Sequence, residues 1–311
     1  MSDDLVGRPR PSHDVDGDLD AGRERLNAAL LIDFFDSRGW DLPWRRSDAT
    51  PWAVLVSEVM LQQTPVIRVL PVYQQWLSRW PTPAHLAADS PGDAIRAWDR
   101  LGYPRRAMRL HAAATAMTAE HGGSVPESID ELLRLPGIGE YTARAVAAFA
   151  FGQRTPVVDT NVRRVLARVV RGVDQPREPA TAIDRSQLAA LLPAEPARAA
   201  RFSAAIMELG ALVCSARNPD CLSCPLADRC RWRLAGAVPG TARRAGQTWH
   251  GTDRQVRGRI LAALRESQVP LADISFANTD VEATQLTRCL ESLLTDGLVV
   301  RVGAAHIGLP D

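Results

Sequence analysis

The stretch LPGIGEYTAR, residues 135–144, places a proline and two glycines directly before a helix start. Glycine permits positive φ and has no side chain, so backbone N–H groups at the start of the next helix can approach an anion closely. The same G-x-G turn is also typical of a tight connection between two packed helices. The stretch therefore predicts a helical hairpin and leaves open whether Gly137 and Gly139 serve packing or anion binding.

Helical periodicity extends from this turn in both directions. From about Ala21 to about Leu234, apolar residues recur at helical spacing, with breaks at proline and glycine and almost no strand-like alternation. Caps and prolines mark several helix ends, as at Thr50-Pro51. The expected helices cover 51–64, 106–121, about 140–151 and the residues after Asp159. Short, closely connected helices predict a mainly α fold packed in layers.

The two ends of the chain differ from this central region. Residues 1–22 are acidic and broken by proline and glycine, which predicts a disordered tail. Residues 236–251 have no apolar periodicity and are interpreted as a linker. Residues 252–311 contain two helical patterns and the apolar run LVVRV at 298–302, which predict a small winged-helix-like α+β module. Acids outnumber its arginines, so a structural or protein-docking role is at least as consistent as DNA binding.

Composition limits the chemistry that the chain can perform. The 311 residues carry a net charge of +1, so any nucleic-acid footprint must be local. No apolar run approaches the ~20 residues that span a bilayer, and the N-terminus does not resemble a signal peptide, so we expect a cytoplasmic protein. All 37 residues counted as lysine or arginine are arginine. Chemistry that needs a lysine amine is therefore excluded.

Four of the five cysteines lie close together, in CSARNPDCLSCPLADRC at residues 214–230. In a protein of the cytosol, such a cluster favours a metal site over disulfides. Four thiolates at this spacing can hold either zinc or an iron–sulfur cluster, and spacing alone does not separate the two. The predicted ligands are Cys214, Cys221, Cys224 and Cys230. The fifth, Cys289, falls on the apolar face of a helix and is interpreted as core.

Two carboxylates stand at positions that suit acid–base chemistry. Glu58 shares a helix face with Val54, Leu55 and Leu61. Burial would raise its pKa and favour the protonated form that a general acid requires, although a structural glutamate fits the pattern equally well. Asp159 precedes a helix, which is typical of an N-cap. One protonated and one ionised carboxyl are together what cleavage of a glycosidic bond uses.

Arginines gather near these carboxylates. Arg144 lies one turn into the helix after the glycine turn, and Arg163, Arg164 and Arg168 follow Asp159. Such density suits contacts with a DNA backbone. A solvated helix face is the alternative.

Taken together, these motifs resemble the helix-hairpin-helix DNA glycosylase superfamily, and within it the adenine DNA glycosylase branch. The matching residues are LPW (42–44), SEVMLQQT (57–64), RLGY (100–103), HGG (121–123), LPGIG (135–139), VVDTNVRRVLAR (157–168), MELGALVC (207–214) and the four-cysteine loop. The resemblance implies a six-helix barrel at about 45–156 and an iron–sulfur domain formed by 23–44 and 157–235. It also implies one 4Fe–4S cluster on the four cysteines, and allows a monovalent cation at the hairpin.

The resemblance also implies a substrate and roles for individual residues. The substrate would be adenine opposite 8-oxoguanine or guanine in duplex DNA, and the enzyme would flip this adenine out of the stack. The enzyme is expected to be a monomer and to have no membrane partner. Glu58 would protonate adenine N7, and Asp159 would stabilise the sugar cation. Tyr141 and Asn161 would position the nucleophile and the substrate. The expected substrate and DNA contacts are Trp44, Arg45, Gln62, Gln63, Thr64, Gly137, Gly139, Arg144, Arg163 and Arg217.

Two other functions compete with this expectation. An endonuclease III-like glycosylase acting on other bases would share the barrel and the cluster, but its strand cleavage uses a lysine amine as Schiff-base nucleophile. Such relatives keep that lysine at the position of Tyr141, and this chain contains no lysine. A non-catalytic iron–sulfur DNA-binding protein is the second alternative. The presence of both Glu58 and Asp159 argues against it.

Overall fold

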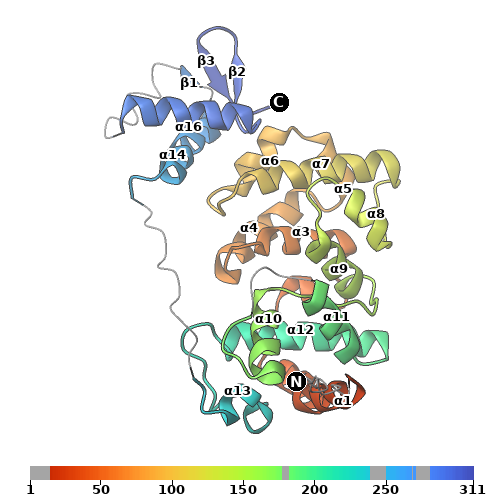
Figure 1. Cartoon of the computed structure of the whole chain (residues 1–311). Coiled ribbons are helices and arrows are strands. Elements are labelled where there is room, and N and C mark those ends of the chain that lie inside the picture. Colours follow the sequence, from red (N-terminus) through yellow and green to blue (C-terminus); the bar gives the residue numbers. More distant parts are fainter. Residues whose placement is uncertain (1–14, 177–181, 239–249, 268, 271–280) are drawn as a thin grey trace, which may run out of the picture. The chain divides into compact units, whose positions relative to one another are not determined.

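The computed structural model describes residues 15–176, 182–238, 250–267, 269–270 and 281–311. The chain divides into two units. Unit 1 combines the segments 1–40 and 152–241, and unit 2 combines 41–151 and 242–311 (Figure 1). The described residues are mainly helical, as the sequence predicts, and the strands lie in the C-terminal part of unit 2.

Unit 2 begins with a set of helices around one apolar core. Its elements are η1 (Pro43–Arg45), α3 (Pro51–Leu61), α4 (Val66–Arg79), α5 (Pro83–Ala88), α6 (Pro91–Trp98), α7 (Arg105–Glu120), α8 (Ile129–Arg134) and α9 (Glu140–Phe149). Trp76 lies at the centre of the core and packs edge-on against Trp80 and Trp98, with ring centroids 4.6 and 5.5 Å apart. Such aromatic pairs add about 1 kcal/mol each beyond the area that they bury.

Helix α3 lies inside this core, and its boundaries follow from local sequence. The Thr50 hydroxyl accepts a hydrogen bond from the Ala53 N–H at 3.1 Å, and Pro51 occupies the first turn. The helix ends at Leu61, before Pro65, as predicted. Nearly every residue of α3 is buried, including Glu58. Helix α9 packs against α3 in the same unit, which brings a side chain of α9 within reach of that carboxyl.

Unit 1 packs a second core from both ends of its sequence. Its elements are α1 (Val15–Leu26), α2 (Ala28–Arg38), α10 (Thr160–Leu166), η2 (Ala167–Arg171), α11 (Ala182–Leu191), α12 (Pro196–Leu212), η3 (Ala227–Arg229) and α13 (Arg231–Leu234). Helix α12 packs against both α2 and α10. Phe202 and Leu209 of α12 are almost fully buried there. The four-cysteine segment leaves the end of α12 and returns through α13.

The C-terminal residues of unit 2 form the predicted α+β module. It consists of α14 (Asp253–Glu266), β1 (Val269–Pro270), α16 (Ala283–Thr295), β2 (Val300–Val302) and β3 (His306–Gly308). The strands are antiparallel in the order β1-β3-β2, and Ile307 pairs with Val269 on one side and Arg301 on the other. Cys289 is 1% exposed in the core of this module, which confirms its interpretation as a core residue.

The N-terminal segment differs from the expectation. Helix α1 begins at Val15, inside the stretch predicted as a disordered tail. Arg23 and Arg25 lie in its last turn, where cations favour the helix dipole, and Leu26 at its end is buried in the core of unit 1. The rest of the predicted tail, residues 1–14, and residues 239–249 of the predicted linker lie outside the described residues. No helix within the described ranges is both long and apolar enough to cross a membrane.

Candidate active site and metal centre

Glu58 and Tyr141 meet inside unit 2. The Tyr141 O–H donates a hydrogen bond to Glu58 Oε2 at 2.9 Å, between residues that are 83 positions apart in sequence. Glu58 is 5% exposed. One turn further along α3, Gln62 Nε2 donates to Thr142 Oγ1 at 3.2 Å. The contact between α3 and α9 therefore fixes a buried carboxyl beside a phenol, an arrangement able to hold and deliver a proton at a defined atom.

Asp159 caps helix α10 in unit 1. Its Oδ1 accepts from the Val162 N–H at 2.7 Å, and its Oδ2 accepts from Asn161 Nδ2 at 2.8 Å. Burial raises the pKa of Asp159 and outweighs these hydrogen bonds and the charge of Arg164, which act in the opposite direction. The structural role expected of an aspartate before a helix is thus present. It leaves a desolvated carboxyl, held in a fixed orientation by its own helix.

A buried arginine joins the Asp159 cap to the cysteine loop. Arg164 Nη2 donates to Asn161 Oδ1 at 2.6 Å and to the Gly210 carbonyl at 2.7 Å, and its Nε donates to the Cys214 carbonyl at 2.7 Å. A Cβ at Gly210 would lie 2.7 Å from Asn161 Cβ, so only glycine allows α10 and α12 this close. Sequence reasoning missed this connection. The three-residue spacing of Asn161 and Arg164 on one helix could have predicted the contact between these two side chains. The contacts of Arg164 with Gly210 and Cys214 have no such signal in the sequence.

The arginines after Asp159 do not form a DNA-facing surface. Arg163, Arg164 and Arg168 are 4%, 8% and 1% exposed. Arg163 Nε pairs with Asp184 Oδ2 at 2.8 Å, and Arg168 Nη2 pairs with Asp174 Oδ1 at 2.7 Å. The interpretation of Arg163 and its neighbours as phosphate contacts is therefore wrong. Their charges face inward because a buried carboxylate or carbonyl meets each of them.

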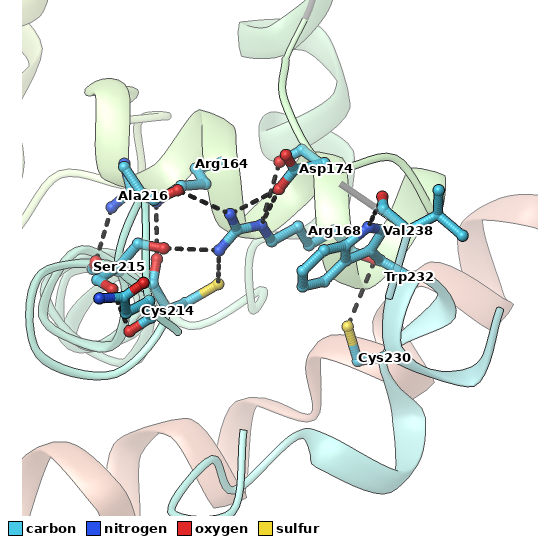
Figure 2. A network of polar contacts seen from close by, with 11 residues as sticks. Arg164, Arg168, Asp174, Cys214, Ser215, Ala216, Cys230, Trp232 and Val238 are labelled. Carbon is cyan, nitrogen blue, oxygen red and sulfur yellow. Dashed lines mark hydrogen bonds and ion pairs between the residues drawn. The ribbon is translucent and has the colours of Figure 1, made fainter. Parts of the chain in front are cut away.

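Figure 2 shows how Arg168 is fixed beside two of the cysteines. Its Nη1 donates to Cys214 Sγ at 3.4 Å and to the Ser215 carbonyl at 2.8 Å. The guanidinium carbon lies 4.6 Å from the ring centroid of Trp232, and Cys230 Sγ donates to the Arg168 carbonyl at 3.5 Å. One arginine thus organises the start and the end of the cysteine loop. It also directs a positive charge at a sulfur that the sequence predicts as a metal ligand.

The four predicted ligands line one cavity in unit 1, and none is in a disulfide. Burial raises the pKa of Cys224 to about 11 and also raises the pKa values of Cys221 and Cys230. Bound metal is what would make such thiols thiolates. Across the described ranges, no three His, Cys, Asp or Glu side chains are arranged to hold a single metal ion. Four cysteine side chains around one cavity fit a metal centre with four thiolate ligands.

The glycine turn connects α8 to α9. Gly137 has a φ of 78°, and a Cβ there would lie 2.5 Å from Arg109 Cβ, so packing alone requires this glycine. Gly139 is the N-cap residue of α9, has a negative φ, and would meet nothing within 4 Å if it carried a Cβ. Arg144, in α9, pairs with Glu140 at 2.9 Å. Of the two interpretations of the turn, helix packing applies to Gly137. Of these two glycines, only Gly139 has the open space that anion binding would need.

The remaining predicted contacts divide into exposed and buried groups. Gln63 is exposed with a φ of 56°, Arg45 is partly buried, and Arg217 is exposed in the cysteine loop. Trp44 is 6% exposed and packs edge-on against Tyr73, so its ring offers little surface to a base. Thr64 is also 6% exposed. Its hydroxyl donates to the Leu101 carbonyl at 3.3 Å, which argues against direct probing of a base by this side chain.

Comparison with known families agrees with the fold and with the cysteine cavity. Residues 56–189 match the HhH-GPD superfamily of base excision DNA repair proteins, and residues 214–230 match the iron–sulfur binding domain of endonuclease III. A trapped endonuclease III–DNA covalent intermediate has the same fold, with a TM-score of 0.59 at 24% identity, covering 70% of this chain and 99% of that one. The cysteine cavity is thus the site of a 4Fe–4S cluster.

Two curated relatives extend over most of the chain. A thymine-DNA glycosylase of Aeropyrum pernix is 35% identical over 68% of this chain and 96% of its own length. An adenine DNA glycosylase of Mycolicibacterium smegmatis is 50% identical over 91% of this chain and 96% of its own length. The second match includes the C-terminal part of the chain and has the higher identity. The protein is a DNA glycosylase of base excision repair, and the chain belongs to the adenine DNA glycosylase family.

Proposed function

We propose that this protein hydrolyses the N-glycosidic bond of adenine paired with 8-oxoguanine or guanine in duplex DNA and leaves the strand uncut. The observation that carries the proposal is the hydrogen bond from the half-buried Tyr141 to the buried Glu58, in a chain 50% identical to an adenine DNA glycosylase. Asp159, the other carboxyl that the reaction needs, is oriented independently by Asn161 and Val162.

The proposed reaction uses the two carboxyls in different protonation states. Glu58, as the acid, gives its proton to adenine N7, and the electrons of the C1′–N9 bond pass to the departing base. The ionised Asp159 stabilises the positive charge that develops at C1′. Water then adds to C1′ and loses a proton, which restores the acid. Tyr141 and Asn161 act by orientation, since each donates a hydrogen bond to one of the two carboxyls.

Strand cleavage by a Schiff base is absent from this proposal. That chemistry needs an amine nucleophile, and the chain has no lysine. The phenol of Tyr141 cannot form an imine, and its donation to Glu58 gives it a different task. The abasic product should therefore remain in an intact strand until alkali or another enzyme cuts it.

The cluster and the hairpin are proposed to bind DNA. When bound, the 4Fe–4S cluster would crosslink the loop 214–230, on which Arg217 is exposed to meet a phosphate. At the hairpin, the open space at Gly139 would let a phosphate reach the first N–H groups of α9. Arg45 and Gln62 are proposed to contact the adenine, and the exposed Gln63 to enter the stack, whereas the buried ring of Trp44 is not proposed to touch a base. The protein is proposed to act on duplex DNA as a monomer.

Adenine release from a panel of duplexes tests the proposal. Single-turnover assays on A:8-oxoguanine, A:G, T:G and uracil-containing duplexes, each analysed with and without hot alkali, separate the base removed from any strand cleavage. We expect adenine to be released from the first two duplexes and strand breaks only after alkali. Release of thymine from T:G in preference to adenine, or breaks without alkali, would refute the proposal.

A further inference from the structure

The C-terminal module of unit 2 packs on helix α6 and the loop that follows it. The Gly92 N–H donates to the Pro310 carbonyl at 2.7 Å, and Ile95 of α6, which is 0% exposed, belongs to the core of the module. Arg265 of α14 donates to the Asp99 carbonyl. These contacts hold α14 beside the loop 99–104.

Two exposed residues with strained backbone conformations lie near this contact. Tyr103 has a φ of 49° and is 41% exposed, and Gln63 has a φ of 56° and is also exposed. Such backbone conformations cost about 1–3 kcal/mol each in residues other than glycine. Buried Arg106 holds both segments, because its Nη1 donates to the Gln62 carbonyl at 2.5 Å and its Nη2 to the Gly102 carbonyl at 2.9 Å. The fold thus presents an amide and an aromatic ring from adjacent turns.

Arg254 of the C-terminal module covers this ring. Its guanidinium carbon lies 4.6 Å from the Tyr103 ring centroid, and the residue is exposed in the first turn of α14. The ring orients the guanidinium by a cation–π contact, and the exposed guanidinium can still bind a phosphate. Residues 252–311 therefore contribute a side chain directly to the loop beside Gln63.

Arginines crowd the same region. Burial, and then the charge of Arg68, lower the pKa of Arg106 to about 10. Burial, and then Arg100, likewise lower the pKa of Arg265, and burial with Arg105 lowers the pKa of Arg257. In each case the positive charge of a neighbouring arginine contributes to the lowered pKa, because two like charges repel. Two of these arginines, Arg105 and Arg257, are already paired with Asp296, whereas Arg254 is exposed.

Helix α16, the second helix of the module, does not present an exposed, unpaired-charge surface suited to phosphates. Glu282 and Glu291 are exposed on or next to α16, and Arg288 there is engaged with Asp253 at 2.7 Å. Because exposed glutamates repel phosphates and Arg288 of α16 is already paired, we do not assign DNA reading to α16. The favourable surface lies on α14 instead.

We propose that the C-terminal module is part of the DNA-binding surface of unit 2, and that Arg254 binds a DNA phosphate next to the base pair at which Gln63 enters the stack. The inference rests on the proposed function only in taking duplex DNA as the substrate. It assigns the module a DNA-binding role without a groove-reading helix.

Equilibrium binding to a duplex with a stable abasic analogue opposite 8-oxoguanine tests this assignment, because it requires no catalysis. Binding of the full-length protein is measured from 50 to 300 mM salt for wild type, Arg254→Ala, Arg254→Lys and the control Arg301→Ala, which changes an exposed arginine of the same module. Loss of one phosphate contact should reduce the salt slope of log K by about 1 and weaken binding roughly tenfold. Arg254→Lys should keep the slope, and Arg301→Ala should match wild type.

Thermal unfolding separates a lost phosphate contact from an undocked module. An Arg254→Ala protein with the wild-type melting curve and the smaller slope supports the assignment. A slope equal to wild type, or equal losses in Arg254→Ala and Arg301→Ala, overturns it. Failure of the proposed function would look different, since wild type would then release no adenine while the binding difference between Arg254→Ala and Arg301→Ala persisted.

Discussion

Arg164 and Asn161 are joined by a 2.6 Å hydrogen bond from Nη2 to Oδ1, and this bond ties the orientation of the Asp159 carboxyl to the cysteine loop. Asn161 donates to Asp159 at 2.8 Å, while Arg164 also donates to the Cys214 carbonyl at 2.7 Å. A structural change at the cluster can therefore reach the Asp159 carboxyl through the Cys214 carbonyl and the side chains of Arg164 and Asn161. Unit 1 contains this whole connection.

Replacing Arg164 should uncouple the carboxyl from the cluster. Arg164→Met leaves the Gly210 and Cys214 carbonyls without this donor, and we expect a loss of about 3 kcal/mol in the free energy of unfolding. Adenine release in single turnover should fall at least tenfold, because Asn161 is no longer fixed. Denaturant unfolding and release assays measure the two effects. Arg198→Ala, which changes an exposed arginine of α12 outside the proposed site, is the matched control, and full activity of Arg164→Met would contradict the coupling.

The two hairpin glycines should respond differently to alanine. Gly137→Ala forces a Cβ to within 2.5 Å of Arg109 Cβ at a φ of 78°, so we expect a loss of at least ~2 kcal/mol in unfolding free energy. Gly139→Ala meets no atom within 4 Å and should leave stability within about 0.5 kcal/mol of wild type. Its affinity for duplex DNA should decrease if a phosphate occupies that space. Equal destabilisation by both changes would refute this distinction.

Arg168 should be necessary for retention of the cluster. Arg168→Leu removes the donor to Cys214 Sγ and leaves Asp174, which is 7% exposed, without its cation. Breaking a buried ion pair in this way costs about 3–5 kcal/mol. Iron per protein and the visible absorbance of the cluster should both fall relative to wild type. Iron content equal to that of Arg217→Ala would show that the arginine is dispensable for the cluster.

Asp159 should lower stability at neutral pH. Its folded-state pKa lies above the unfolded value because burial dominates, so ionisation costs folding free energy. This cost is fully present above the folded pKa and disappears as pH falls through it toward the unfolded value of about 4. Asp159→Asn should therefore unfold at a higher temperature than wild type at pH 7, with a smaller difference at pH 4.5. A variant less stable than wild type at pH 7 would show that the hydrogen bonds outweigh burial.

Residues adjacent to each helix predicted where the helices begin, whereas contacts between helices determine which arginines are buried. The starts of α3, α9 and α10 depend on Thr50, the glycine turn and Asp159, each adjacent to the helix it begins. Whether Arg163 faces water depends on Asp184, which lies on a different helix, so periodicity could not distinguish a DNA contact from a buried ion pair. The contact of Tyr141 with Glu58 likewise needs the packing of α3 on α9.

The most direct test of the central claim compares catalysis and binding in Asp159→Asn. Single-turnover adenine release from an A:8-oxoguanine duplex is measured beside equilibrium binding to the same duplex, with iron content checked in both proteins. We expect Asp159→Asn to keep wild-type affinity and iron content and to release adenine at least ~1000-fold more slowly, because the developing charge at C1′ loses its carboxylate. Release near the wild-type rate would contradict the proposed role of Asp159.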